Sequence, residues 1–126
     1  MSWELDTARP VYLQLIEQIQ AGIISGLYKP GDKLPSVRDL AMEATVNPNT
    51  MQKALTELER TGLVYANRTS GRYITSDESL IHKLREESAL LLVRGFIERM
   101  QRHGFTPDET LLYVTNLVKE IKAAQN

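Results

Sequence analysis

The sequence predicts a mainly α-helical protein that carries one small β-hairpin and ends in two further helices. Three observations predict this fold class. Apolar residues recur at helical spacing in three segments of residues 1–76, and two short β-prone segments follow them. Residues 77–126 contain helical patterns only. The 126 residues are 42% hydrophobic and 25% charged, a composition typical of a folded globular chain.

The first helix is expected over residues 11–25. Its apolar face consists of Tyr12, Leu15, Ile16, Ile19 and Ile23, which follow the spacing of one side of a helix. Gly26 is a suitable stop, and the Pro30-Gly31 pair predicts a turn. Beyond this turn, we expect Lys33-Leu34 to be extended and to pair with the hairpin.

A short second helix and a third helix follow, with a tight turn between them. Ser36 is the expected N-cap of the second helix, over residues 37–44. Asn47 is the expected N-cap of the third helix, which begins at Pro48 and ends before Gly62. The predicted core face of the third helix is Met51, Ala54, Leu55 and Leu58.

The hairpin is predicted from two β-prone segments, residues 63–66 and residues 72–75. The polar segment 67–71 lies between them and is rich in residues that favour turns. With the three helices before it, this hairpin completes a first domain, residues 1–76.

The C-terminal part, residues 77–126, is expected to be a helical hairpin. One long helix is predicted over residues 78–103 and ends at Gly104. The last helix begins with Thr106 as N-cap, Pro107 at the first helical position and Glu109 at the third, which is a capping-box pattern. Residues 77–126 form the second expected domain.

The order of elements in residues 1–76 is that of a winged helix-turn-helix, in which the third helix enters the major groove of DNA. Side chains on the outer face of its first turns are polar and either uncharged or positive, and such groups pair with base edges and phosphates. Cations before the second helix, on it and in the hairpin are expected nearby. The candidate DNA-binding residues are Lys33, Ser36, Arg38, Asn47, Asn49, Thr50, Gln52, Lys53, Arg68, Gly71 and Arg72.

Charge and capping leave other interpretations open. The net charge of the chain is −1, and residues 1–76 carry eight Lys/Arg and eight Asp/Glu, whereas nucleic-acid binders usually have a basic surplus. Arg38 could pair with Asp39 or Glu43, and helix capping alone explains Asn47. A winged helix that binds a protein instead of DNA is the alternative function, and the salt dependence of binding would distinguish the two.

Four segments between residues 8 and 75 carry a family resemblance. They are Pro10-Val11-Tyr12-Leu13-Gln14; Gly26 to Ala41, with its Pro30-Gly31-Asp32-Lys33-Leu34-Pro35-Ser36 run; Val46-Asn47-Pro48-Asn49-Thr50; and Leu58 to Leu63. In this order and spacing they closely resemble the DNA-binding domain of the GntR family of bacterial regulators. The resemblance implies DNA binding, with contacts from the positions of Arg38, Asn49, Thr50 and Gln52.

The hairpin departs from the family pattern Arg-Gly-X-Gly-Thr-Phe-Val. Thr69 stands in place of a glycine, and Arg72 replaces a small residue, which favours a phosphate contact through Arg72. Pro48 occupies a position where some relatives carry an arginine. The short two-helix C-terminal segment resembles the YtrA-like subfamily.

The long helix predicts a homodimer, because the apolar run at residues 89–93 extends almost around its axis. Two helices alone cannot bury that much surface, and a second copy would also supply the paired half-sites of a two-fold operator. The alternative is that the helical hairpin packs on its own winged domain. The expected dimer interface is Leu84, Leu91, Leu92, Phe96, Leu111, Val114, Leu117 and Val118.

Several function classes are not expected. The sequence has no cysteine, no phosphate loop, no nucleophile elbow and no metal-ligand spacing, so we expect no enzyme activity, no cofactor and no metal site. No apolar run approaches the roughly 18 residues of a membrane span, and the N-terminus lacks a signal-peptide pattern, which favours a cytoplasmic protein. We expect a homodimeric repressor on double-stranded operator DNA, released by a small-molecule effector of unknown identity where one exists.

Overall fold

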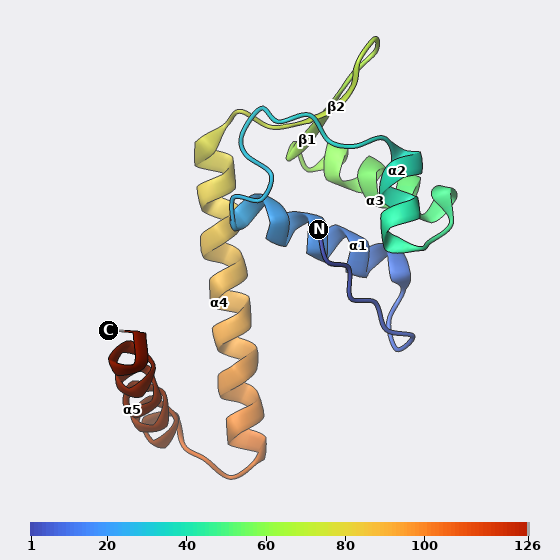
Figure 1. Ribbon diagram of the computed structural model, residues 1–126. Helices are drawn as coiled ribbons and strands as arrows, with labels where there is room; N and C mark the ends of the chain where they lie inside the picture. Colours follow the sequence, from blue (N-terminus) through green and yellow to red (C-terminus); the bar gives the residue numbers. More distant parts are fainter. Residues whose placement is uncertain (126) are drawn as a thin grey trace. The chain divides into compact units, whose positions relative to one another are not determined.

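The computed structural model describes residues 1–125 and contains, within them, five helices and two strands (Figure 1). The helices are α1 (Val11–Ile24), α2 (Val37–Ala44), α3 (Pro48–Arg60), α4 (Glu78–Arg102) and α5 (Pro107–Gln125), and the strands are β1 (Val64–Asn67) and β2 (Gly71–Ile74). The predicted fold class, mainly α-helical with a small β wing, is confirmed. The chain divides into two packed units, Met1–Arg85 and the part from Glu86 onward, so the division falls inside α4 and not before it.

Local capping sets the start of the two short helices. The Ser36 hydroxyl accepts a hydrogen bond from the Asp39 amide at 3.1 Å, so it caps α2. The Asn47 side-chain oxygen accepts from the Asn49 amide at 2.8 Å, and Pro48 occupies the first turn of α3. Both caps satisfy amides that have no partner inside the helix, which is why the chain enters its helices at these residues.

The two strands form an antiparallel hairpin with Val64 opposite Ile74 and Asn67 opposite Gly71. The strands therefore lie one residue nearer the turn than predicted, and the turn is residues 68–70. Gly71 allows this shift because its φ of +110° is one that residues with a Cβ rarely adopt. As expected, the segment after the Pro-Gly turn pairs with the hairpin, since Leu34 donates to the Arg72 carbonyl at 2.9 Å.

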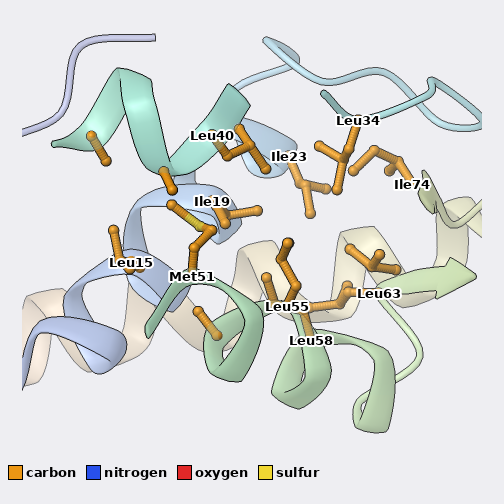
Figure 2. Packing of buried hydrophobic residues seen from close by; sticks show 14 residues of the cluster. Leu15, Ile19, Ile23, Leu34, Leu40, Met51, Leu55, Leu58, Leu63 and Ile74 are labelled. Atoms are coloured by element: carbon orange, nitrogen blue, oxygen red, sulfur yellow. The ribbon is translucent and has the colours of Figure 1, made fainter. Parts of the chain in front are cut away.

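One hydrophobic core holds the N-terminal unit together (Figure 2). It takes side chains from α1, α2, α3, the hairpin and the extended segment, and Figure 2 shows them pointing toward one another. The largest fully buried apolar ones are Leu15, Ile19, Leu40, Met51, Leu55, Leu58, Ile74 and Val64. Leu80, Ile81 and Leu84 pack against this core, so the first turns of α4 belong to the N-terminal unit.

The segment before α1 is bound along that helix. Gln14 is 2% exposed; its side-chain amide donates to the carbonyls of Asp6 and Arg9 and accepts from the Asp6 amide, each at 2.9 Å. Gln18 bonds the backbone of Glu4 in the same way. The two side-chain amides thus bond the backbone of this segment as a neighbouring strand would, at Glu4, Asp6 and Arg9. These bonds hold Trp3, in the same segment, against the core.

The unit from Glu86 onward contains the rest of α4, a short connection and α5. Gly104 ends the first helix with a φ of +92°. The predicted capping box is confirmed, because the Thr106 hydroxyl accepts from the Glu109 amide and the Glu109 carboxylate accepts from the Thr106 amide, both at 3.1 Å. Within residues 1–125, no helix has the length and apolar character of a membrane span.

Candidate nucleic-acid interface

The first turns of α3 present a polar face to solvent. Asn49, Gln52 and Lys53 are exposed, and Thr50 is half-buried. On the opposite side the buried residues Met51, Ala54, Leu55 and Leu58 fix α3 on the core. The predicted orientation of this helix is therefore confirmed, with amide, hydroxyl and amino groups facing outward.

Several of these side chains already have partners. The Asn47 side-chain oxygen is engaged in the cap, and the Gln52 amide donates to the Thr56 hydroxyl at 3.3 Å. The Lys53 ammonium lies 3.8 Å from the centre of the Tyr12 ring on α1, a cation–π distance. Lys53 is thus directed toward α1, whereas the side chain of the exposed Asn49 forms no hydrogen bond within residues 1–125.

A groove lies between the start of α2 and the hairpin. It brings together five predicted residues that are far apart in the sequence, namely Lys33, Ser36, Arg38, Gly71 and Arg72, with Leu34, Pro35, Val37, Asp39 and Ser70 completing its walls. A second hollow, next to the start of α3, is lined by Arg38 together with Met42, Val46 and Pro48. Arg38 therefore lies between the groove and the third helix.

Arg38 is exposed, and within residues 1–125 it forms no ion pair. The alternative in which Asp39 or Glu43 neutralises it is not realised. An exposed guanidinium without an acidic partner keeps all its donors for an external anion. The same holds for Lys33, which lines the same groove and has no acidic partner in the described part of the chain.

Arg72, unlike Arg38 and Lys33, has an acidic partner within the fold. Its Nε donates to a carboxylate oxygen of Glu59 on α3, and the two side chains are 19% and 28% exposed. Glu59 neutralises the charge of Arg72 and turns the side chain toward the helix. Arg72 thus connects the hairpin to α3, and its phosphate contact stays a prediction.

Ion pairing also neutralises Glu57, the other acidic residue in the second half of α3. Glu57 accepts two hydrogen bonds from the Arg60 guanidinium, at 2.8 and 2.5 Å, and this contact lowers the pKa of Glu57. Both carboxylates of the helix therefore have a cationic partner. The local charge around the groove is positive although the whole chain carries −1.

The hairpin tip carries the last predicted cation. The hairpin extends away from the helices of the N-terminal unit (Figure 1). Arg68 is exposed in its turn and forms no ion pair within the described residues. Gly71 adjoins the groove, where an added Cβ would lie 3.5 Å from the Lys33 side chain.

The partners that these residues have across the fold were not predicted from the sequence. Tyr12 and Glu59 were not assigned to the site, although they hold Lys53 and Arg72. Tyr73 and Asn67 were missed at the hairpin, where they bond the turn residues. Only the Asn-x-Thr spacing of residues 67–69 is a local signal, because an Asn side chain commonly bonds the amide two residues on.

The predicted interface residues of the C-terminal helices are exposed apart from Leu84. Leu91 and Leu92 on α4 are 71% and 76% exposed, and Leu111 and Leu117 on α5 are 65% and 57% exposed. Phe96, Val114 and Val118 are also exposed. Leu84 is half-buried and packs against the core of the N-terminal unit, so it differs from the rest of the set, and its place in a dimer interface stays a prediction.

Comparison with known proteins places these features in a family. Residues 11–74 match the family described as bacterial regulatory proteins, gntR family. The transcriptional repressor YtrA of Bacillus subtilis is 46% identical over 71 residues, which are 56% of this chain and 55% of that protein, so the chain matches about half of that relative. A GntR family transcriptional regulator from Listeria monocytogenes has a solved structure with a TM-score of 0.83 and 38% identity, over 89% of this chain and 98% of that one.

A solved structure of the AraR DNA-binding domain in complex with its operator ORX1 is also similar. It has a TM-score of 0.52 and 27% identity, over 60% of this chain and 90% of that one. The family match covers α1 through β2, the elements that form the groove and the exposed face of α3. The chain therefore belongs to the GntR family of bacterial regulatory proteins, which are DNA-binding transcriptional regulators and not enzymes.

Proposed function

We propose that this chain is a homodimeric repressor that binds a two-fold operator through its winged helix-turn-helix. One observation carries the proposal: three cations have no acidic partner within residues 1–125. Lys33 and Arg38 line the groove, and Arg68 lies in the turn of the hairpin, which is the wing. Phosphates respond to such local positive charge, so a net charge of −1 does not oppose binding.

In the proposed complex, α3 lies in the major groove with its first turns against the bases. The amides of Asn49 and Gln52 suit adenine, and Thr50 suits a base edge or a thymine methyl group. Ser36 and Asn47 cap α2 and α3 and so orient the helix N-termini, which favour phosphate. Lys53 reaches a phosphate by leaving the Tyr12 ring, which an exposed cation–π contact permits at small cost.

We propose that a second copy covers the exposed apolar residues of the C-terminal helices. The support is their exposure, because Leu91, Leu92, Phe96, Leu111, Val114, Leu117 and Val118 are between 38% and 76% exposed. Large contiguous apolar surfaces on soluble proteins mark interaction sites. A closed two-fold dimer would cover the same surface on both copies and present two recognition helices to two half-sites.

Repression is favoured because the relative YtrA is named a repressor. A dimer on its operator would block transcription by occupying DNA, without a separate surface for recruiting polymerase. We further propose that the protein acts in the cytoplasm, and that any small effector binds the C-terminal helices and changes the spacing of the two recognition helices. Isothermal titration of the protein with candidate metabolites, followed by DNA binding, tests the last point.

The experiment that tests the main proposal is DNA binding at several salt concentrations. The full chain is titrated onto a labelled fragment from upstream of its own gene, with scrambled DNA of the same length as competitor. We expect sequence-specific binding. With about six phosphate contacts in the complex, the affinity should fall about a thousandfold as the salt concentration rises from 50 to 200 mM. Binding that ignores salt, or that scrambled DNA removes, contradicts the proposal and favours a protein partner for this surface.

A further inference from the structure

The hairpin turn, residues 68–70, contains three polar residues, and two of them are held by side chains of the strands. The Asn67 side-chain oxygen accepts from the Thr69 amide at 3.1 Å and from the Thr69 hydroxyl at 3.0 Å. The Tyr73 hydroxyl donates to the Ser70 hydroxyl oxygen at 2.8 Å. The third residue, Arg68, is exposed and lacks an acidic partner in the described part of the chain.

Tyr73 is itself fixed by its neighbours. Its ring stacks on that of Tyr65, the residue opposite it in the ladder, with centroids 5.6 Å apart and planes at 19°. On its other side, β2 pairs with the extended segment through the bridge between Tyr73 and Lys33. The hydroxyl that holds Ser70 therefore sits on a ring with little freedom to move.

The hairpin is also fixed to the recognition helix, by a residue close to its turn. Arg72 adjoins Tyr73 in β2, and its guanidinium bonds the Glu59 carboxylate on α3. The pair is partly buried, at 19% and 28% exposed, so water screens it less than a surface ion pair. The position of the turn is thus defined with respect to the helix that carries Asn49 and Gln52.

We propose that Tyr73 and Asn67 are positioning residues that fix the turn, so that the Arg68 guanidinium is presented to the DNA backbone in its binding geometry. This inference rests on the proposed function, since it concerns how the wing meets DNA. A three-residue turn without these bonds would have to be ordered on binding, and that ordering weakens affinity. The exposed charge of Arg68 and the hydrogen bonds that hold Thr69 and Ser70 then serve the same contact with the DNA backbone.

The test is a double-mutant cycle between Tyr73 and Arg68. Tyr73→Phe removes only the hydroxyl, and Tyr65→Phe is its matched control, because the stacked ring is kept and no hydrogen bond of the Tyr65 hydroxyl is present within residues 1–125. We expect Arg68→Ala to weaken operator binding about tenfold and to lower the salt slope by about 1.8, because both copies in the dimer lose a phosphate contact. Tyr73→Phe should weaken binding about threefold, as for loss of one neutral hydrogen bond, and Tyr65→Phe should leave it unchanged.

A positioning role predicts that Tyr73→Phe has no further effect once Arg68 is alanine. Asn67→Ala should behave in the same way, about threefold weaker in the wild-type background and without effect beside Arg68→Ala. The inference is overturned if Tyr73→Phe binds as tightly as wild type, because the hydroxyl would then have no role in binding. It is also overturned if the loss persists in the Arg68→Ala background, because the hydroxyl would then act on binding by a route other than Arg68. Failure of the wild-type chain to bind any upstream fragment is a separate result, which overturns the proposed function and this inference with it.

Discussion

Leu55 on α3 and Leu91 on α4 are the same residue type in the middle of two helices, yet Leu55 is fully buried and Leu91 is 71% exposed. In the N-terminal unit, helices, hairpin and extended segment close around a common core. From Glu86 onward, the one buried side chain within the described residues is that of Thr110, and the leucines face solvent. One unit is complete within a single chain, whereas the other exposes the apolar surface that a partner would cover.

This difference assigns separate tasks to the two units. The N-terminal unit holds the groove and α3 rigidly, because residues of both pack into its core. The C-terminal helices contribute no residue to that groove. Their effect on DNA binding is therefore expected through assembly, and stability of one unit should be separable from assembly of the other.

The largest effect is expected from Leu55→Ala. Removing a fully buried leucine leaves a cavity, and such substitutions lower the free energy of unfolding by about 2–5 kcal/mol. Urea denaturation followed by circular dichroism measures this loss. Leu91→Ala is the matched control, and it should leave the unfolding of the N-terminal unit within about 0.5 kcal/mol of wild type. Equal losses at both positions would contradict the contrast between the two units.

Leu91→Asp should act on assembly. A carboxylate placed in an apolar interface must lose its water, so we expect the dimer to dissociate about a hundredfold more readily. Analytical ultracentrifugation measures the shift, and Gln101→Asp, on an exposed polar residue of the same helix, controls for the added charge. Operator affinity should fall in parallel. A stable Leu91→Asp dimer would remove Leu91 from the interface, and a monomeric wild type would end the dimer proposal.

Arg38→Ala should act on DNA binding alone. Its guanidinium is exposed and unpaired within residues 1–125, so its loss is expected to weaken operator binding about tenfold without changing the melting temperature. Arg60→Ala is the control, because Arg60 is equally cationic but is bonded to Glu57 at the other end of α3. Anisotropy with a labelled operator compares the two. If both variants bind alike, Arg38 has no special role in the interface.

Features set by neighbouring residues could be predicted from the sequence, and features set by packing could not. The caps Ser36, Asn47 and Thr106 were all identified, because capping depends on residues within one turn. The groove was anticipated as a gathering of cations, but the pairing of Arg72 with Glu59 was not, since it joins a strand to a helix 13 residues away. The packing of Leu84 on the N-terminal core was not predicted either, because a helical pattern alone does not tell which neighbouring elements cover a residue.

The smallest effect is expected at the turn between α2 and α3. Thr45 has a φ of +57°, and it is the one residue other than glycine with a positive φ within residues 1–125. A β-branched side chain at this φ costs about 1–2 kcal/mol of strain, which glycine would relieve. Glycine also makes the unfolded chain more flexible, which offsets about 0.5–1 kcal/mol of that gain. Thr45→Gly should therefore raise the free energy of unfolding by about 0.5 kcal/mol.

Thr61 provides the matched control for this substitution. It also follows a helix, but it has a φ of −80° and its hydroxyl bonds the Leu58 carbonyl at 2.8 Å. Thr61→Gly should destabilise the protein by about 1 kcal/mol, since no strain is relieved and one hydrogen bond is lost. Opposite signs at the two threonines, measured by urea denaturation, would show that the helix-turn-helix turn is strained. The same sign at both would mean that the α2–α3 turn accommodates threonine without cost.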